Sequence, residues 1–155
     1  MTGKIDARLT ALNIELPDAP APAANYVPFV LSGNLVFVSG QVPWVGGERN
    51  FVGKVGIDYT VDEGQDAART VALNIIAQVK AACDGDLDRV VRCIKLGGFV
   101  NCPDNFHQQP QVINGASDLM VDVFGDAGRH SRFAVGAPAL PFNVAVEIDA
   151  VFEVR

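Results

Sequence analysis

The chain has 155 residues and a mass of 16.5 kDa, about the length of one domain. Hydrophobic residues make up 49% of it and charged residues 19%, which is too apolar for a disordered chain and too poorly charged for a coiled coil. The formal net charge of −6 opposes binding to phosphate backbones, and the low charge content favours burial of apolar surface between subunits.

The N-terminal third predicts a helix, an arm and a hairpin. Residues 4–13 carry apolar side chains at helical spacing and predict a short amphipathic helix. Residues 15–28 hold four of the nine prolines, so we expect an extended arm there. The runs 27–31 and 35–39 are rich in β-branched and aromatic residues on either side of a glycine turn, which predicts a β-hairpin.

The middle of the chain predicts a loop followed by alternating helices and a strand. Residues 43–64 are punctuated by glycine and predict a long loop with one short strand. Apolar residues then recur every three or four positions over 63–82, as in a helix. Residues 89–100 predict a long strand, and 110–124 predict a second helix that begins at a proline and ends before a glycine.

Two further strands, at 131–137 and 144–154, complete the order β-β-α-β-α-β-β. We therefore expect an α+β fold in which two helices cover one face of a mostly antiparallel sheet. Residues 1–21 would form the N-terminal helix and extended arm, and 22–155 a single domain. Because the strands are apolar on both alternating sets of side chains, we expect the uncovered face to meet a partner.

The cysteines and the N-terminus predict a cytoplasmic protein. Cys83, Cys93 and Cys102 form no CxxC pair, and their odd number speaks against a disulfide framework. The first seventeen residues lack the apolar core of a signal peptide, and no run of about 18 apolar residues could span a membrane.

Motifs for phosphates, dinucleotides, zinc proteases and serine hydrolases do not occur in the sequence. The only histidines are His107 and His130. A Cys102–His107 pair has a CxxxxH spacing but no further ligands, so we expect no zinc site.

The most informative charges lie near the C-terminus. Arg132 starts an apolar strand and Glu147 sits in the middle of the next one, so we expect both on adjacent central strands. A half-buried guanidinium is suited to bidentate capture of a carboxylate, and a nearby carboxylate could act as a general base on water. From the pattern alone, a plain ion pair between Arg132 and Glu147 across a hairpin is the favoured alternative.

These residues also carry a resemblance to a known family. Arg132 stands eight residues before Leu140-Pro141, and Glu147 stands seven residues after Leu140. In these spacings the chain resembles the RidA/YjgF family of reactive-intermediate imine and enamine deaminases, formerly labelled endoribonuclease L-PSP. The resemblance covers roughly residues 22–155. Further matching residues are Tyr26, Gly33-Asn34, Ser39-Gly40-Gln41-Val42-Pro43 and Asn114.

The resemblance implies a chorismate-mutase-like sandwich that assembles as a homotrimer with clefts between subunits. It also implies hydrolysis of 2-imino or 2-enamino acids to 2-keto acids and ammonia without metal or cofactor. By position, Arg132 would grip the substrate carboxylate and Glu147 would position or activate water. The Gly40 backbone and the side chains of Tyr26 and Asn114 would shape and polarise the pocket.

Some segments depart from the family pattern and indicate a divergent subgroup. Ala134 stands where many members have a cysteine. The N-terminal helix, the insertion after Gln41 and Arg129-His130 are expected near the cleft mouth. His130 could be a pocket residue or loop surface, and Trp44 and Phe51 could close the pocket or pack beneath the long loop.

Two other functions are open from the sequence. The same clefts could hold a small carboxylate without turning it over, as a binding or sensing module. An endoribonuclease is disfavoured because the chain is acidic and lacks a basic stripe interleaved with aromatic residues. For all of these functions we expect a small carboxylate or a second copy of the chain as the partner, and no membrane.

Overall fold

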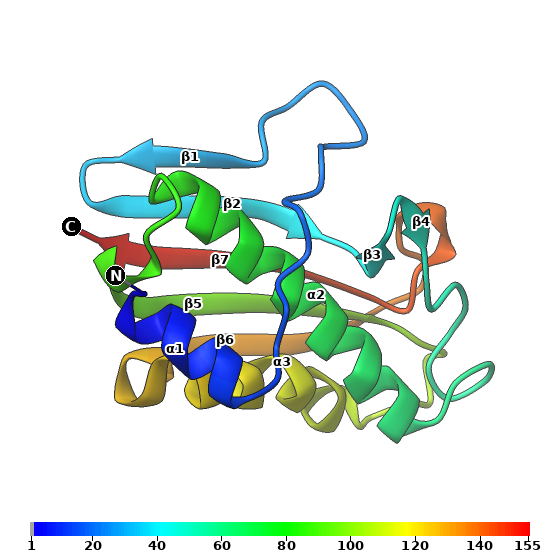
Figure 1. Cartoon of the computed structure of the whole chain (residues 1–155). Coiled ribbons are helices and arrows are strands. Elements are labelled where there is room, and N and C mark those ends of the chain that lie inside the picture. The colour runs from blue at the N-terminus through cyan, green and yellow to red at the C-terminus, as the bar shows by residue number, and fades with distance from the viewer. Residues whose placement is uncertain (1) are drawn as a thin grey trace.

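The structure, a computed structural model, describes residues 2–155. Its centre is a five-stranded sheet in the order β1-β2-β7-β5-β6 (Figure 1). The strands are β1 (Phe29–Ser32), β2 (Leu35–Gln41), β5 (Val90–Asn101), β6 (Ser131–Ala137) and β7 (Val146–Val154). Neighbouring strands are antiparallel except β5 and β6, which are parallel. The predicted α+β fold with a mostly antiparallel sheet is confirmed.

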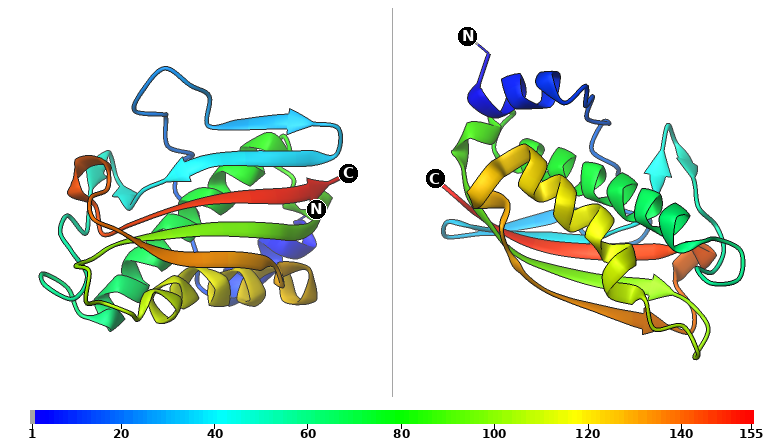
Figure 2. Two further views of the ribbon diagram at one scale, coloured as in Figure 1. Left: turned by 180° about the vertical axis from the view of Figure 1, so that it is seen from behind. Right: turned by 90° about the horizontal axis from the view of Figure 1, so that it is seen from below.

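Two long helices cover one face of this sheet (Figure 2). They are α2 (Val61–Ala82) and α3 (Gln109–Phe124). Helix α2 begins before the predicted position because a capping box fixes its first turn: Thr60 Oγ1 accepts from the Glu63 N–H, and the Glu63 carboxylate accepts from the Thr60 N–H. Short 3-10 helices are η1 (Leu87–Arg89), η2 (Gly125–Gly128) and η3 (Pro141–Asn143). No helix in residues 2–155 is long and apolar enough to cross a bilayer.

The core lies between these helices and the sheet. In β7 the side chains of Val146, Ile148, Ala150 and Phe152 are buried toward the helices, as the alternation predicts. The opposite set, which includes Glu147, points to the uncovered face.

The route of the chain separates the two strands that were expected to be neighbours. Helix α3 connects β5 to a parallel β6, so β6 becomes the edge strand beside β5. Strand β7 then returns between β2 and β5. The prediction that Arg132 and Glu147 lie on adjacent central strands is therefore wrong, since β5 stands between them.

The glycine-punctuated segment contains a small hairpin where one short strand was predicted. Strands β3 (Trp44–Val45) and β4 (Glu48–Arg49) pair antiparallel, with Trp44 opposite Arg49. The turn between them uses Gly46 and Gly47, both at positive φ, a conformation that glycine adopts without strain. This hairpin lies beside the end of β2 (Figure 1).

The predicted N-terminal helix is present as α1 (Lys4–Ala11) and lies at the opposite end of the fold from β3 and β4 (Figure 1). The Asp88 carboxylate accepts hydrogen bonds from the Lys4 and Ile5 N–H groups, both at 2.8 Å. These two bonds lower the pKa of Asp88, and the bond from the Ile5 N–H has the larger effect. They fix the start of α1 to the body of the domain.

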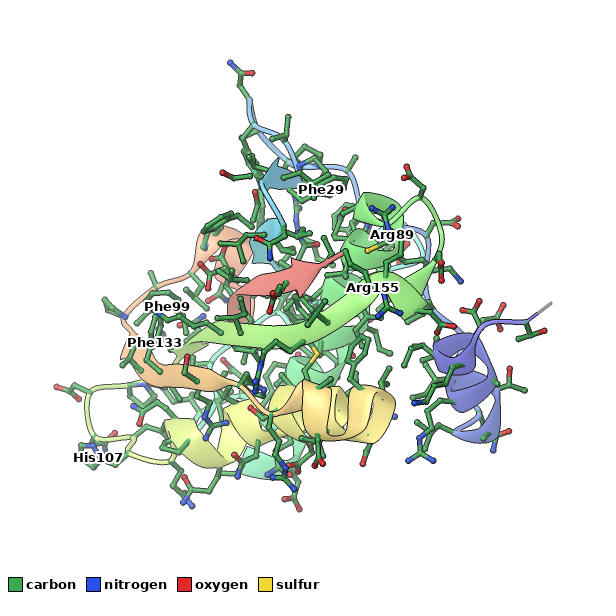
Figure 3. All side chains as sticks on the ribbon, turned by 90° about the vertical axis from the view of Figure 1, so that its left-hand side faces the viewer. Phe29, Arg89, Phe99, His107, Phe133 and Arg155 are labelled. Atoms are coloured by element: carbon green, nitrogen blue, oxygen red, sulfur yellow. The ribbon has the colours of Figure 1, made fainter. Side chains whose placement is uncertain are left out.

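The second face of the sheet carries no helix, and its apolar side chains project outward. Figure 3 shows Phe99 and Phe133 on the side of the sheet away from α1, and their rings meet edge to face with centroids 5.3 Å apart. The strand register places the following apolar residues on this face: Val30, Phe37, Phe99, Phe133, Val135 and Val151. We refer to them as the open face. The expectation that this face meets a partner stays a prediction.

Candidate functional site

A cavity of about 710 Å³ opens at the end of the sheet where β2, β7 and the β3–β4 hairpin come together. Its walls come from the extended arm, the end of β2, the hairpin, η3 and the start of β7. The lining residues are Pro20, Ala21, Pro22, Ala23, Ala24, Tyr26, Pro28, Gly40, Gln41, Val42, Trp44, Arg49, Pro141, Phe142 and Glu147. Three predicted site residues, Tyr26, Gly40 and Glu147, therefore share one pocket.

Glu147 provides the carboxylate of this pocket. Burial, with a further contribution from the charge of Asp149, raises the pKa of Glu147. No basic side chain within residues 2–155 forms an ion pair with it. A carboxylate with a raised pKa and no cation beside it binds a proton more readily than an ordinary glutamate, which suits a general base.

Gly40 is required for the position of this carboxylate. A Cβ at residue 40 would lie 2.5 Å from Glu147 Oε1 and 3.2 Å from its Cδ. The pairing of β2 with β7 also changes register between Val38 and Gln41, so Gly40 lies in a bulge. The glycine thus lets the Glu147 carboxylate rest directly against the backbone of β2.

Two buried amides of α2 hold the pocket walls. Asn74 Nδ2 donates to the carbonyls of Val42 and Trp44, both at 3.0 Å, and Gln78 Nε2 donates to the Pro20 carbonyl at 2.7 Å. Asn74 and Gln78 are each only 1% exposed. Because they lie one helical turn apart, a single face of α2 positions both the hairpin entry and the arm.

We expect Gln78→Met to lower the free energy of unfolding by about 1–3 kcal/mol, because the half-buried Pro20 carbonyl would lose its donor. Denaturant titration measures this change. Gln65→Met is the matched control, since Gln65 on the same helix donates a 2.7 Å bond to the Gln111 carbonyl at an exposed position. Equal losses in the two variants would contradict an anchoring role for Gln78.

Arg132 lies on the other face of the sheet from Glu147. Its register partner in β5 is the buried Leu96, whereas Glu147 is opposite the outward-pointing Phe99. The guanidinium turns toward α3, donating from Nη1 to Ser117 Oγ at 3.0 Å and from Nη2 to the Pro110 carbonyl at 3.1 Å. The alternative of an ion pair between Arg132 and Glu147 is therefore wrong.

His130 belongs to the same group as Arg132. Its Nδ1 lies 2.6 Å from the Gly128 carbonyl, which can only accept, so the pattern assigns the proton to Nδ1. Nε2 is then left to accept from the Ser117 hydroxyl at 2.8 Å. The resulting chain runs from Arg132 through Ser117 to His130 and fixes the direction of the guanidinium. Asn114 lies one helical turn before Ser117 on α3.

The predicted site residues thus form two groups within one chain. Tyr26, Gly40 and Glu147 line the pocket, while Asn114, His130 and Arg132 gather where α3 meets β6.

Of the segments expected at the cleft mouth, the insertion contributes Trp44 and Arg49, whereas α1 and Arg129-His130 contribute no lining residue. Phe51 packs against Tyr59, with centroids 5.7 Å apart, and does not line the pocket. The lining residues missed in the sequence include Arg49, Phe142 and the arm residues 20–24, because none of them lies in a periodic segment.

The cysteines are buried and free. Burial raises the pKa of Cys93 to about 12, so its thiol stays protonated near neutral pH and is a poor nucleophile. In the part of the chain that the structure describes, no three His, Cys, Asp or Glu side chains gather as a metal-binding group.

Comparison with known proteins gives consistent matches over the whole chain. A family model described as "YjgF/chorismate mutase-like, putative endoribonuclease" matches residues 6–153. Protein TCP17 of Trypanosoma cruzi is 51% identical over 99% of this chain and 96% of its own length.

Solved structures agree with the sequence matches. A protein of unknown function from Agrobacterium tumefaciens is 52% identical and superposes with a TM-score of 0.91, covering 97% of this chain and 92% of its own. Escherichia coli TdcF with bound serine is 26% identical with a TM-score of 0.63, covering 88% and 93%.

Proposed function

Because this chain belongs to the YjgF/chorismate mutase-like family, we propose that it hydrolyses reactive 2-imino and 2-enamino acids to 2-keto acids and ammonia. The reaction would take place in the pocket around Glu147, completed by a second copy of the chain in a homotrimer. The single observation that carries this proposal is a half-buried carboxylate, seated against the Gly40 backbone and facing a largely apolar cavity, whose burial raises its pKa.

A second copy is needed because one chain holds only half of the predicted site in its pocket. Arg132 is held on the helix-covered face by Ser117 and Pro110, so it cannot reach a substrate beside Glu147 of the same chain without crossing the sheet. It lies on the edge strand β6, where a neighbouring molecule can approach it. The open face supplies the apolar surface that such an assembly would bury.

The chemistry requires few groups. Ionised Glu147 takes a proton from water as the water oxygen attacks C2 of the iminium, and the C=N π electrons move to nitrogen. Glu147 then gives its proton to the nitrogen of the tetrahedral amino-alcohol. As the C–N bond breaks, the hydroxyl oxygen forms the keto group and its proton passes to the ionised Glu147. Ammonia then takes this proton from Glu147 and leaves as ammonium, which restores the ionised carboxylate. Arg132 of the neighbouring copy would hold the carboxylate throughout.

The comparisons support a ligand of this size. TdcF, which shares this fold, has been solved with bound serine, a small molecule with one carboxylate and a nitrogen on C2. A 2-imino acid presents the same carboxylate and nitrogen in a planar form. We propose that this chain binds such a molecule by its carboxylate.

The direct test uses the whole protein and an amino acid oxidase that generates 2-iminopropanoate or 2-iminobutanoate in solution. We expect the protein to accelerate release of the keto acid. Semicarbazide traps the imine that remains, so the amount of trapped imine measures this release. An unchanged rate would contradict the deaminase, and a ligand that raises the melting temperature but emerges unaltered would identify a binding module. Cleavage of single-stranded RNA that requires Glu147 would instead identify an endoribonuclease.

The pH dependence gives a further prediction. Glu147 acts as a base only when ionised, so kcat/KM should fall as the pH drops through a pKa above the ordinary range of glutamate. Asp149→Asn removes a neighbouring negative charge, which lowers the pKa of Glu147 and moves the acid limb to lower pH. Glu153→Gln, on the same strand and face but farther along, is the control. If Asp149→Asn does not shift the pH at which kcat/KM falls, this result would contradict Glu147 as the base.

A further inference from the structure

The pocket contains a second charged residue that neither the family pattern nor the proposed mechanism uses. Arg49 at the end of the β3–β4 hairpin lines the cavity together with Glu147. Its guanidinium carbon lies 3.6 Å above the centroid of the Phe142 ring and 5.7 Å from that of Trp44. A guanidinium stacked on a ring at this distance is held by its face, which leaves its N–H edge to bind other groups.

No group in the described part of the chain uses that edge. Within residues 2–155, Arg49 forms no ion pair and donates no side-chain hydrogen bond. Its sequence neighbour Glu48 lies on the same strand, where adjacent side chains point to opposite faces. A chain with a net charge of −6 thus presents an unpaired guanidinium at the pocket that contains its candidate base.

The ring beneath Arg49 is fixed at a cost in backbone strain. Phe142 and Asn143 both have a φ of 58°, a left-handed conformation that is unfavourable for residues with a Cβ. The buried Asn101 holds this turn, since its Nδ2 donates to Asn143 Oδ1 and to the Val144 carbonyl, both at 3.0 Å. The Gly53 N–H also donates to the Asn143 carbonyl at 2.7 Å. The position of the Phe142 ring is therefore determined by several contacts.

The cavity is also large for the smallest imino acids. Its volume of about 710 Å³ lies within the range of pockets that enclose drug-sized ligands. Apart from Glu147 and Arg49, the walls are mostly proline, alanine and aromatic side chains. A substrate could lie along these walls with its reacting carbon near Glu147 and a second acidic group at Arg49.

We propose that Arg49 binds a distal carboxylate, so that the preferred substrates are 2-imino dicarboxylates rather than 2-imino acids with small apolar side chains. This inference rests on the proposed function, because it assigns the reacting carbon to Glu147. Arg49 is then a specificity-determining residue, and Phe142 and Trp44 are the residues that orient it.

Binding can be measured without turnover because Trp44 is the only tryptophan of the chain and lines the pocket. We expect 2-oxoglutarate, the product of a 2-imino dicarboxylate, to change the Trp44 fluorescence at lower concentration than 2-oxobutyrate. Arg49→Gln should weaken 2-oxoglutarate binding about ten- to a hundredfold and leave 2-oxobutyrate binding unchanged. Arg49→Lys should recover part of the affinity, because it keeps the charge but loses the planar stack.

Arg69→Gln is the matched control, since Arg69 is exposed on α2 outside the pocket. The inference is overturned if the two keto acids bind equally to the protein, or if Arg49→Gln weakens both to the same extent. A preference for 2-oxoglutarate that depends on Arg49, in a protein without deaminase activity, would reject the proposed function and keep Arg49 as an anion-binding residue. Deamination of 2-iminobutanoate by a protein that binds the two keto acids equally would keep the proposed function and reject the role of Arg49.

Discussion

Replacing Glu147 with glutamine is expected to lower kcat for imine hydrolysis by about 10²–10⁴-fold, the range typical for loss of a general base. Glutamine keeps the size of the side chain and its contact with the Gly40 backbone but cannot take a proton from water. Keto-acid release from an enzymatically generated imine measures the effect. Glu153→Gln, on the same face of β7, should retain wild-type activity.

The stability of this variant separates a chemical role from a structural one. Because burial raises the pKa of Glu147, the folded protein binds this proton more tightly than the unfolded chain does. The ionised carboxylate therefore opposes folding at neutral pH, and this penalty shrinks as the pH falls below the raised pKa and is gone below the ordinary pKa of glutamate. Glu147→Gln should consequently melt at the same temperature as the wild type or higher at pH 7. A lower melting temperature together with lost activity would indicate that Glu147 is needed for the fold.

Replacing Arg132 with alanine is expected to lower kcat/KM by about a hundredfold or more, because the substrate carboxylate would lose a charged bidentate partner. Steady-state kinetics with 2-iminobutanoate should show the loss, and Arg69→Ala provides the control for removal of an exposed arginine. Ser117→Ala should have a smaller effect, mainly on KM, since it removes one of two acceptors that orient the guanidinium. Wild-type kinetics in Arg132→Ala would exclude it from the substrate site.

Mixing the two inactive variants tests whether a site is shared between chains. If Arg132 and Glu147 of one site come from different copies, coexpressed Arg132→Ala and Glu147→Gln chains can form sites in which both residues are wild type. In trimers assembled at random from equal amounts, about one quarter of the sites would be of this kind. Activity near that fraction is expected. No recovery in verified mixed trimers would show that one chain supplies both residues.

The elements that could be predicted are those with a clear period. Strand 131–137 is observed at Ser131–Ala137, and the helix predicted over 110–124 lies at Gln109–Phe124, because alternation and helical spacing record which side chains face the core. The hairpin of β3 and β4 was missed because each strand has only two residues, too short for any period to appear. Its turn glycines gave the only local signal.

The residues of the candidate site could be predicted from the sequence, but their arrangement in space could not. The residue spacings together with the family resemblance identified Glu147 and Gly40, which do meet in the pocket. The spacing contained no information on the strand order, which places β5 between Arg132 and Glu147 and sends the two side chains to opposite faces. Asn74 and Gln78 gave a signal that could have been used, since polar residues on the buried face of a helix must find hydrogen-bond partners.

The left-handed turn at Phe142 and Asn143 limits how this protein could be made more stable. Glycine at position 142 would relax the backbone there, because glycine adopts a positive φ without strain. At position 142, however, glycine would also delete the ring on which the Arg49 guanidinium rests. Thermal stability and ligand selectivity therefore place opposite demands on residue 142. Selection for thermal stability alone is expected to widen the range of acids that the pocket accepts.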